Sequence, residues 1–429
     1  MRIIIIGNSA TAVGAVETIR LYDQSAEILV ITKESSLIYS RPMLSHYLAG
    51  QIDQARVAYR DPDFYCRYDV QVITDDAVVG VDLAARTVTT ESGLTQSYDK
   101  LLISTGGVPI VPPMPGVDAE GVYTFTELSD ADGILERVQS ERPVQNAVVV
   151  GGGMIGIKAV DALQQRGVKV TMLELAPRIL SAAFDQKASD IVSDILGSSG
   201  VTVLTENTVA QIHTVDGAIS EVTLRSGETI PCDLLVFGIG VRPNSALAKS
   251  AGLEVNRGVM VDSFMRSSDP YVYAAGDVAE AYDLVVDMNR TVAIWPNAYR
   301  QGAIAGAHMV GVERPDAGGI AMNTIEADGV AAMAIGDANM EDSGQENLQF
   351  LSDMDERAHR YRRLVIRDGR LVGAILVGDV NRAGIYTGLI RSKVPVADCC
   401  KTLLSPHFGL LSLPEHYRKH VVTGEGIEI

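Results

Sequence analysis

Residues 147–156, AVVVGGGMIG, carry an apolar run straight into a glycine-rich turn. Gly151, Gly153 and Gly156 satisfy the G-x-G-x-x-G spacing. In that spacing the first glycine permits the tight turn, the second lets the backbone approach a pyrophosphate, and the third lets helix and strand pack closely. Unpaired N–H groups and the positive end of the helix dipole converge at such a turn. The stretch therefore predicts a βαβ unit that binds a dinucleotide.

An acidic residue follows the second strand of this unit. The apolar run 168–173 ends at Glu174, where a carboxylate accepts hydrogen bonds from ribose hydroxyl groups and disfavours a 2′-phosphate. We therefore expect NAD(H) to be preferred over NADP(H). The unit closes with an apolar strand at 234–237, followed by a turn that contains Gly238 and Gly240.

A weaker copy of the same turn lies at the start of the chain, in residues 3–12, IIIIGNSATA. Gly7 keeps the first position, whereas Ser9 and Ala12 replace the second and third glycines. Ser9 puts a hydroxymethyl group where the backbone should be bare. The nearest carboxylate after the second strand is Glu34. Two turns predict two dinucleotide sites, and a strand-to-helix turn without a ligand is the alternative for this copy.

The composition is that of a globular protein with more than one domain. The chain has 429 residues, 47% of them hydrophobic and 21% charged, and this length predicts two or three domains. A net charge of −18 argues against general binding to nucleic acids or anionic membranes, because both require a cationic surface. No stretch reaches the length of a membrane span, and the first residues enter a core strand rather than a signal peptide, so we expect a cytoplasmic protein.

The cysteines predict neither a disulfide framework nor a metal site. Cys66, Cys232, Cys399 and Cys400 form no C-x-x-C pair for zinc or thiol redox chemistry. Cys399 and Cys400 are adjacent, and either a strained vicinal disulfide or two buried reduced thiols would fit them.

Six motifs in a fixed order resemble the FAD-dependent pyridine nucleotide-disulfide oxidoreductase superfamily. They are Gly7-x-Ser9-x-x-Ala12, Leu101-Leu102-Ile103-Ser104-Thr105-Gly106, Gly151-x-Gly153-x-x-Gly156, Gly238-x-Gly240-x-Arg242-Pro243-Asn244, Tyr273-Ala274-Ala275-Gly276-Asp277 and Trp295-Pro296-Asn297-Ala298-x-Arg300-Gln301-Gly302. Because their order and spacing hold over most of the chain, the set is far more specific than either glycine turn alone.

The resemblance implies an α/β fold with two Rossmann-like, three-layer dinucleotide-binding domains and a C-terminal α+β domain. Residues 1–115 and 245–315 would form a discontinuous FAD-binding domain, and residues 116–244 an inserted NAD-binding domain. Residues 316–429 would form a C-terminal interface domain. A proline-rich stretch at 109–116 is typical of a linker between the first two domains.

The resemblance also implies cofactor contacts. Thr105 and Gly106 would lie beside the flavin nucleotide, and the backbone at Val78 would touch the adenine. Asp277 would bind the ribityl and pyrophosphate region of FAD, with helix capping as its alternative role. The residues expected to bind cofactors are Gly7, Ser9, Ala12, Glu34, Arg41, Val78, Thr105, Gly106, Gly276, Asp277 and Asn297 for FAD, and Gly151, Gly153, Gly156, Glu174, Gly238 and Gly240 for NAD(H).

The stretch 38–46, IYSRPMLSH, departs from the family pattern. Members that reduce disulfides, peroxide or oxygen through a cysteine carry it in this neighbourhood, and here no cysteine is present. The stretch instead resembles the branch with rubredoxin, ferredoxin and nitrite reductase flavoproteins, whose partner is another redox centre. Arg41 would bind FAD phosphate, because a guanidinium holds phosphate bidentately.

The same resemblance points to two candidate catalytic residues. Much of that branch has a lysine after Leu-Ser that approaches the flavin, paired with a glutamate after the second glycine motif. This chain has His46 and Lys158 at those positions. A cation near the flavin would raise its reduction potential. A solvated or salt-bridged helix lysine is the alternative for Lys158.

The C-terminal segment resembles flavoprotein subunits that accompany iron-sulfur and tungsten or molybdenum oxidoreductases. Seven Arg and His residues between Arg357 and Arg370 form a basic island in an acidic protein. Such an island suits an acidic, ferredoxin-like partner. Arginines on exposed strand faces are the alternative explanation.

Together these features predict an FAD-dependent NAD(H) oxidoreductase that passes electrons between NAD(H) and an iron-sulfur protein or subunit. Hydride transfer between the nicotinamide and flavin N5 would be the chemical step, with the protein supplying alignment and electrostatics. We expect an oligomer or a subunit of a hetero-complex. A free-standing NADH oxidase or peroxidase and a non-catalytic, FAD-stabilised interaction module are the alternatives.

Overall fold

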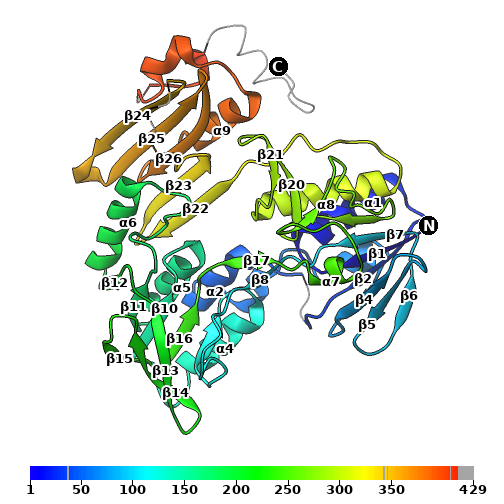
Figure 1. Ribbon diagram of the computed structural model, residues 1–429, viewed down its shortest axis with the longest axis horizontal. Helices are drawn as coiled ribbons and strands as arrows, with labels where there is room; N and C mark the ends of the chain where they lie inside the picture. Colours follow the sequence, from blue (N-terminus) through cyan, green and yellow to red (C-terminus); the bar gives the residue numbers. More distant parts are fainter. Residues whose placement is uncertain (36–37, 342–343, 345, 406, 414–429) are drawn as a thin grey trace. The chain divides into compact units, whose positions relative to one another are not determined.

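The computed structural model describes residues 1–35, 38–341, 344, 346–405 and 407–413 (Figure 1). The chain divides into two compact units. The first comprises Met1–Pro112, Tyr123–Pro143 and Gly240–Gly319. The second comprises Pro113–Val122, Val144–Ile239 and the described residues from Ile320 onward, so the C-terminal segment belongs to the same unit as the Gly151 turn.

A five-stranded parallel sheet forms the centre of the first unit, in the order β19-β7-β1-β2-β3. Ile3, Ile4 and Ile5 of β1 are fully buried, as expected for a parallel sheet that is covered on both faces. The strands are β1 (Arg2–Ile6), β2 (Glu27–Ile31), β3 (Val70–Ile73), β7 (Lys100–Ile103) and β19 (Val272–Ala274). The N-terminal apolar runs thus form the predicted parallel sheet.

Smaller sheets and short helices complete the first unit. The smaller sheets join β5 to β4 and β6, β8 to β17, and β20 to β18 and β21. Their strands are β4 (Val78–Asp82), β5 (Thr87–Thr90), β6 (Thr95–Ser97), β8 (Gly107–Pro109), β17 (Val241–Pro243), β18 (Val259–Met260), β20 (Ala279–Asp283) and β21 (Met288–Arg290). The helices are α1 (Ala10–Tyr22), η1 (Arg41–Met43), α2 (Leu44–Ala49), η2 (Gln54–Val57), α3 (Phe64–Arg67), α4 (Leu128–Val138), α7 (Ala246–Ser250) and α8 (Trp295–Met309).

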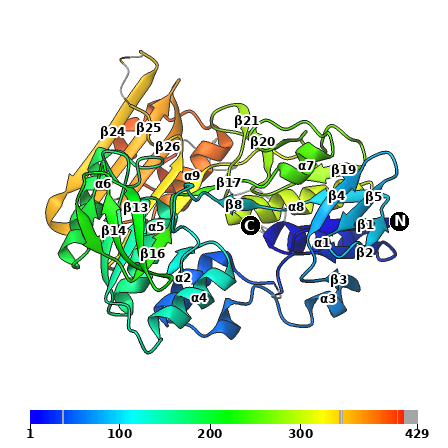
Figure 2. The ribbon, with the colours of Figure 1, turned by 60° about the horizontal axis from the view of Figure 1, so that its bottom comes forward.

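Helices α1 and α8 lie side by side at very short distance (Figure 2). Glycines permit this approach: a Cβ atom added to Gly302 would overlap the carbonyl oxygen of Thr11, and one added to Gly14 would overlap that of Tyr299. The first turn of α1 is thereby held against α8, which begins at Trp295 and contains the Trp295 motif.

A second sheet, in the order β12-β11-β10-β16-β9, has parallel pairing from β12 through β16. It confirms the second Rossmann-like domain that the Gly151 motif predicts. Its strands are β9 (Val122–Thr124), β10 (Asn146–Val150), β11 (Lys169–Leu173), β12 (Thr202–Leu204) and β16 (Leu234–Phe237). The other elements of this part are α5 (Met154–Gln165), α6 (Gln186–Ser198) and the antiparallel strands β13 (Val209–Val215), β14 (Ala218–Leu224) and β15 (Thr229–Pro231).

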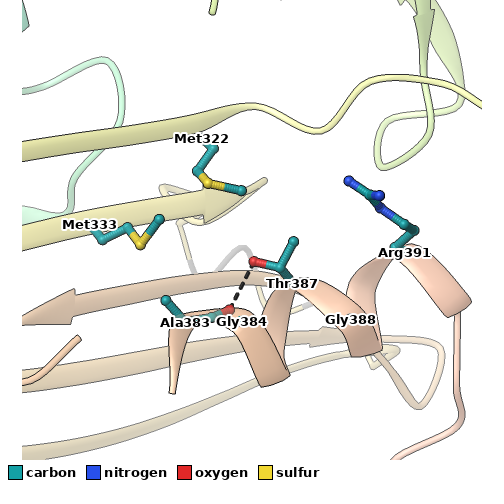
Figure 3. A pocket seen from close by; sticks show the side chains of 7 residues that line it. All are labelled: Met322, Met333, Ala383, Gly384, Thr387, Gly388 and Arg391. Carbon is teal, nitrogen blue, oxygen red and sulfur yellow. Dashed lines mark hydrogen bonds between the residues drawn. The ribbon is translucent and has the colours of Figure 1, made fainter. Parts of the chain in front are cut away.

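The C-terminal segment forms an antiparallel sheet in the order β22-β23-β26-β25-β24, with α9 packed on β26 and β23. A groove of about 370 Å³ lies between α9 and the strands β22 and β23, and Arg391 stands at one end of it (Figure 3). None of the residues expected to bind cofactors lines this groove. The elements are β22 (Met322–Ala327), β23 (Val330–Gly336), β24 (Leu348–Asp355), η3 (Glu356–Ala358), β25 (Arg360–Arg367), β26 (Arg370–Val377), α9 (Ala383–Ser392), η4 (Ala397–Thr402) and η5 (Leu410–Ser412).

The basic island on β25 is largely neutralised by carboxylates. Its ion pairs are Arg360 with Asp355, Arg362 with Asp353, Arg363 with Asp185 and Arg367 with Asp337, at 2.6 to 3.4 Å. Arg357, His359 and Arg370 are exposed. Most of these arginines therefore hold the C-terminal sheet together and do not form a free cationic face.

Within the described part of the chain, every helix falls short of the length and apolar character needed to cross a bilayer. The same residues contain no cluster of three or more His, Cys, Asp or Glu side chains arranged to hold a metal ion.

The α1–α8 crossing can be tested with Gly302→Ala. The added methyl group forces the two helices apart, so we expect a loss of roughly 1–3 kcal/mol in stability. Gly197→Ala is the control, because Gly197 lies exposed in α6 and an added Cβ meets no atom within 4 Å. It is expected to be neutral or to gain up to about 1 kcal/mol. Thermal unfolding measures both, and a parent-like melting temperature for Gly302→Ala would contradict the packing.

Candidate functional site

The Gly151 turn joins β10 to α5 through close backbone contacts. Gly151 has a φ of +112°, and its N–H donates to the carbonyl of Leu173 at 2.7 Å. A Cβ added there would lie 2.6 Å from the carbonyl oxygen of Gly238, and one added to Gly156 would overlap the carbonyl oxygen of Gly151. A Cβ on Gly238 would in turn approach Gly156 Cα to 2.9 Å. The fold itself therefore requires these three glycines.

Gly153 differs from these three glycines, because packing within the fold does not require a glycine at this position. It is the N-cap of α5, with a φ of −85° that any residue adopts, and an added Cβ would meet no atom within 4 Å. The space beside it lies at the N-terminus of a helix whose first N–H groups lack intrahelical partners. A bare backbone at this point fits the approach of a pyrophosphate.

Glu174 stands at the end of β11 beside this turn. Its carboxylate accepts hydrogen bonds from the N–H groups of Gly152 at 2.6 Å and Ala176 at 2.7 Å. One backbone donor on each oxygen fixes the carboxylate and leaves further acceptor capacity for hydroxyl groups. Sequence patterns locate Glu174 but not these two donors, because nothing in Gly152 or Ala176 marks them.

The Gly7 turn has the same construction. Gly7 has a φ of +109°, its N–H donates to Ile31 at 2.8 Å, and an added Cβ would overlap the carbonyl oxygen of Ser104. Ser9 is the N-cap of α1, the place that Gly153 has on α5, and its side chain makes no capping hydrogen bond. Ala12 is buried. The degenerate copy therefore folds like the intact one.

Two further strand ends lie in the first unit with the Gly7 turn. Gly276, with a φ of +80°, donates its N–H to Gln301 at 2.8 Å, and an added Cβ would overlap Thr11 Oγ1. Thr105 donates its hydroxyl to the carbonyl of Asn244 at 2.8 Å. The structure thus brings the Gly276 turn against the first turn of α1.

Gly106, Gly240, Asn297 and Val78 complete the predicted set. Gly106 and Gly240 have φ values of +67° and +112°, and an added Cβ at either meets no atom within 4 Å. Asn297 is buried in the first turn of α8 and accepts a hydrogen bond from Arg300 at 3.4 Å. Val78 begins β4. Their cofactor roles stay predictions.

Asp277 is a half-buried carboxylate with no hydrogen-bond partner among the described residues. Burial raises its pKa, and the nearby Arg41 guanidinium offsets part of that rise. A carboxylate that is partly removed from water and lacks partners is costly to maintain for the fold alone. Helix capping does not explain it, since it makes no capping hydrogen bond. An anionic hydrogen-bond acceptor for the hydroxyl groups of a ligand fits this environment.

Arg41 is held by a second carboxylate. Its guanidinium pairs with Glu34 at 2.7 Å and donates to the carbonyl of Thr126, while the Tyr39 hydroxyl donates to the other Glu34 oxygen at 2.6 Å. Burial opposes the charged form of Arg41, but the surrounding acidic groups outweigh it and raise its pKa. Arg41 and Glu34, predicted as separate cofactor contacts, are therefore each other's partners here.

His46 and Lys158 differ in their surroundings. His46 is exposed on α2, and its Nδ1 atom is hydrogen-bonded to Gln51. Lys158 is half-buried on α5, and burial lowers its pKa. Within the described residues Lys158 has no hydrogen bond or ion pair, so the salt-bridge alternative finds no support there. A catalytic role for either residue stays a prediction.

The adjacent cysteines lie in η4 as two thiols. Cys399 donates to the carbonyl of Val396 and Cys400 to the side chain of Gln349, each at 3.6 Å. This arrangement fits the reduced pair rather than a vicinal disulfide. Cys232 is buried, and burial raises its pKa to about 12, which leaves it unreactive as a thiolate.

Comparison with known proteins agrees with this geometry. Residues 1–302 match the pyridine nucleotide-disulphide oxidoreductase family, and residues 322–394 match the rubredoxin NAD+ reductase C-terminal domain. The chain is 30% identical over 412 residues to the NAD(P)H nitrite reductase of Bacillus subtilis (strain 168), covering 94% of this chain and 49% of that protein. It therefore spans about half the length of that relative.

A second relative matches end to end. The epsilon subunit of the NADH-dependent phenylglyoxylate dehydrogenase of Aromatoleum evansii is 30% identical over 394 residues, with 91% of each chain covered. Among solved structures, an NAD-dependent persulfide reductase from A. fulgidus superposes with a TM-score of 0.84 at 27% identity, over 93% of this chain and 78% of that one. The chain therefore belongs to the pyridine nucleotide-disulphide oxidoreductase family, whose members bind FAD and NAD(H).

Proposed function

We propose that this chain is an FAD-dependent NAD(H) oxidoreductase that passes electrons between NAD(H) and an iron-sulfur partner protein or subunit. The observation that carries the proposal is the pair of like-built turns at Gly7 and Gly151, which have differently charged surroundings. Arg41 and Asp277 lie in the first unit with Gly7, and Glu174 lies beside Gly151. Two different dinucleotides in one chain are the mark of a protein that moves electrons from one to the other.

The first unit offers what FAD requires. The Gly7 turn would receive the pyrophosphate, and Arg41 would leave Glu34 to bind phosphate. Asp277 would accept hydrogen bonds from hydroxyl groups of the ribityl chain. FAD, when bound, accepts two electrons together and releases them singly. We propose residues 1–115 and 245–315 as the FAD domain and residues 116–244 as the NAD domain.

The chain's own residues would bind and orient the nicotinamide nucleotide. The open N-terminus of α5 at Gly153 suits its pyrophosphate, and Glu174 suits a ribose with both hydroxyl groups. Alignment of reacting groups is the main contribution that a protein makes to such chemistry.

The absence of a cysteine in the stretch 38–46 supports an external electron partner, since no internal disulfide is available there. The Aromatoleum evansii relative is by name a subunit of a larger dehydrogenase. We therefore infer that this chain works in an oligomer or a hetero-complex, with residues 316–429 as its interface domain. We also infer a cytoplasmic location, where the thiols of Cys66 and Cys400 would stay reduced.

Asp277→Asn tests whether Asp277 serves FAD binding or the stability of the fold. Because burial raises the pKa of Asp277, ionisation opposes folding: the stability contributed by the neutral acid is complete below its unfolded pKa and is lost as the pH rises through the folded pKa. The amide avoids this loss, so FAD-free Asp277→Asn should melt at a higher temperature than the parent near neutral pH. It should bind FAD roughly tenfold more weakly or worse, because a hydrogen bond to a charged acceptor contributes about 1.5–3 kcal/mol.

Melting curves from about pH 4, near the unfolded pKa of an aspartate, to about pH 8 measure the effect on stability, and fluorescence quenching measures FAD affinity. A variant that is less stable than the parent and binds FAD equally well would show that Asp277 serves the fold alone.

Glu174→Gln tests the nucleotide preference. The parent should prefer NADH over NADPH by roughly tenfold or more, about 1.4 kcal/mol or above, because the carboxylate repels a 2′-phosphate. The amide keeps an acceptor for a ribose hydroxyl and removes the charge, so the preference should fall to a few-fold. Glu228→Gln, an exposed acid in the β14–β15 hairpin, controls for the change in net charge. Equal dissociation constants for NADH and NADPH in the parent would refute the role of Glu174.

The proposed function is tested by anaerobic mixing. FAD-loaded protein should lose its flavin absorbance on addition of NADH and stay reduced until an oxidised rubredoxin or ferredoxin is added. Oxidised glutathione should leave it reduced. Rapid reoxidation by glutathione would contradict the proposal, and fast turnover with oxygen alone would indicate an oxidase. A flavin that NADH never bleaches would indicate a non-catalytic module.

A further inference from the structure

The loop 175–185 follows Glu174 and leads into α6. It contacts the Gly151 turn and holds it in place. Leu180 donates its N–H to the carbonyl of Gly152 at 2.8 Å, and a Cβ added to Gly152 would lie 2.7 Å from Ile179 Cγ2. Ser189 donates its hydroxyl to the carbonyl of Ile179 at 2.8 Å. The position of the glycine turn therefore depends on the position of this loop.

The backbone of the loop is strained at Leu180, the residue that donates to Gly152. Leu180 has a φ of +56°, in the left-handed region that a leucine disfavours. Such a residue keeps its conformation only where neighbouring contacts over-determine it. The contacts that flank Leu180 therefore decide whether its N–H stays on Gly152.

One of these contacts comes from the C-terminal sheet. Asn339, in the connection between β23 and β24, donates its amide to the carbonyl of Ser181 at 2.6 Å, directly after Leu180. Its Oδ1 atom accepts from Arg178 at 3.4 Å. Asn339 thus binds the loop on both sides of Ile179 and Leu180.

Asn339 is itself rigidly held. Arg363 of β25 donates to the carbonyls of Ala338 and Met340, at 3.4 and 2.7 Å, and Arg367 pairs with Asp337 at 2.7 Å. The arginines of the basic island therefore fix the backbone on either side of Asn339. Through Ser181 and Leu180, this support reaches Gly152 in two hydrogen bonds.

We propose that Asn339 is a positioning residue for nicotinamide nucleotide binding, acting through Leu180 on the Gly151 turn and on Glu174. The inference rests on the proposed function for the identity of the nucleotide. In physical terms, a side chain of the β23–β24 connection sets the nucleotide affinity of a glycine turn that it does not touch. A ligand or partner that moved the 337–340 segment would change nucleotide affinity by the same route.

The test compares two variants that each remove contacts from this sheet to the nucleotide-binding segment. Asn339→Ala removes the contacts to Ser181 and Arg178. Tyr361→Phe removes the hydrogen bond of 2.6 Å to Asp185, the N-cap of α6, and leaves Leu180 and Gly152 untouched. FAD content per chain and melting temperature show that both variants are folded.

Titration with NADH, followed by its fluorescence, gives the dissociation constant of each FAD-loaded variant. Asn339→Ala loses two hydrogen bonds, and the neutral one to Ser181 is the bond next to Leu180. Loss of that bond predicts NADH binding roughly three- to tenfold weaker than in the parent, with FAD affinity unchanged. Tyr361→Phe should stay within about twofold, because it leaves the turn supported. Parent-like NADH affinity in Asn339→Ala, or an equal loss in Tyr361→Phe, would overturn the inference. A parent that binds no NADH would instead overturn the proposed function.

Discussion

Both dinucleotide turns depend on backbone atoms that approach more closely than a side chain would allow. Gly7 lies against the carbonyl of Ser104, and Gly151 against that of Gly238. In each case the first strand of a parallel sheet ends beside a neighbouring strand and turns at once into a helix. The same constraint recurs where α1 meets α8. The arrangement of strand ends, helix N-termini and ligand-binding loops follows from these few contacts.

The two turns differ at the N-cap position of the helix, where packing does not require a glycine. Ser9 and Gly153 are both N-caps, and the open space around Gly153 shows that this position tolerates a side chain. A glycine is needed there only for close approach of a ligand, so the second turn is the more demanding site. The charges differ as well, with Arg41 and Asp277 in the first unit and Glu174 at the second turn. These differences support our proposal that the two turns bind two unlike ligands.

Sequence patterns predict much of this fold because its main signals are local. Buried apolar runs and glycine spacing locate both parallel sheets, and Glu174 follows from its distance to the turn. Contacts between distant residues carry no such signal. Nothing near Arg41 shows that its guanidinium donates to the carbonyl of Thr126, and nothing near Asn339 points to Ser181.

The arginines of β25 also show that sequence patterns do not reveal contacts between distant residues. Their clustering in sequence predicts a basic island, but their partners Asp185, Asp337 and Asp353 come from three separate elements. Pairing converts a candidate docking face into support for the sheet and for the 337–340 segment. His46 and Lys158 stay predictions, because their proposed action needs the bound cofactor.

We propose that the Gly7 and Gly151 turns are separate sites for two different dinucleotides. Calorimetric titration of the FAD-free protein with FAD, followed by titration of the loaded protein with NAD+, tests it most directly. We predict one FAD per chain and then one NAD+ per chain, with no release of FAD during the second titration. Displacement of FAD by NAD+, or a single nucleotide bound per chain in total, would show that the two turns are not separate sites.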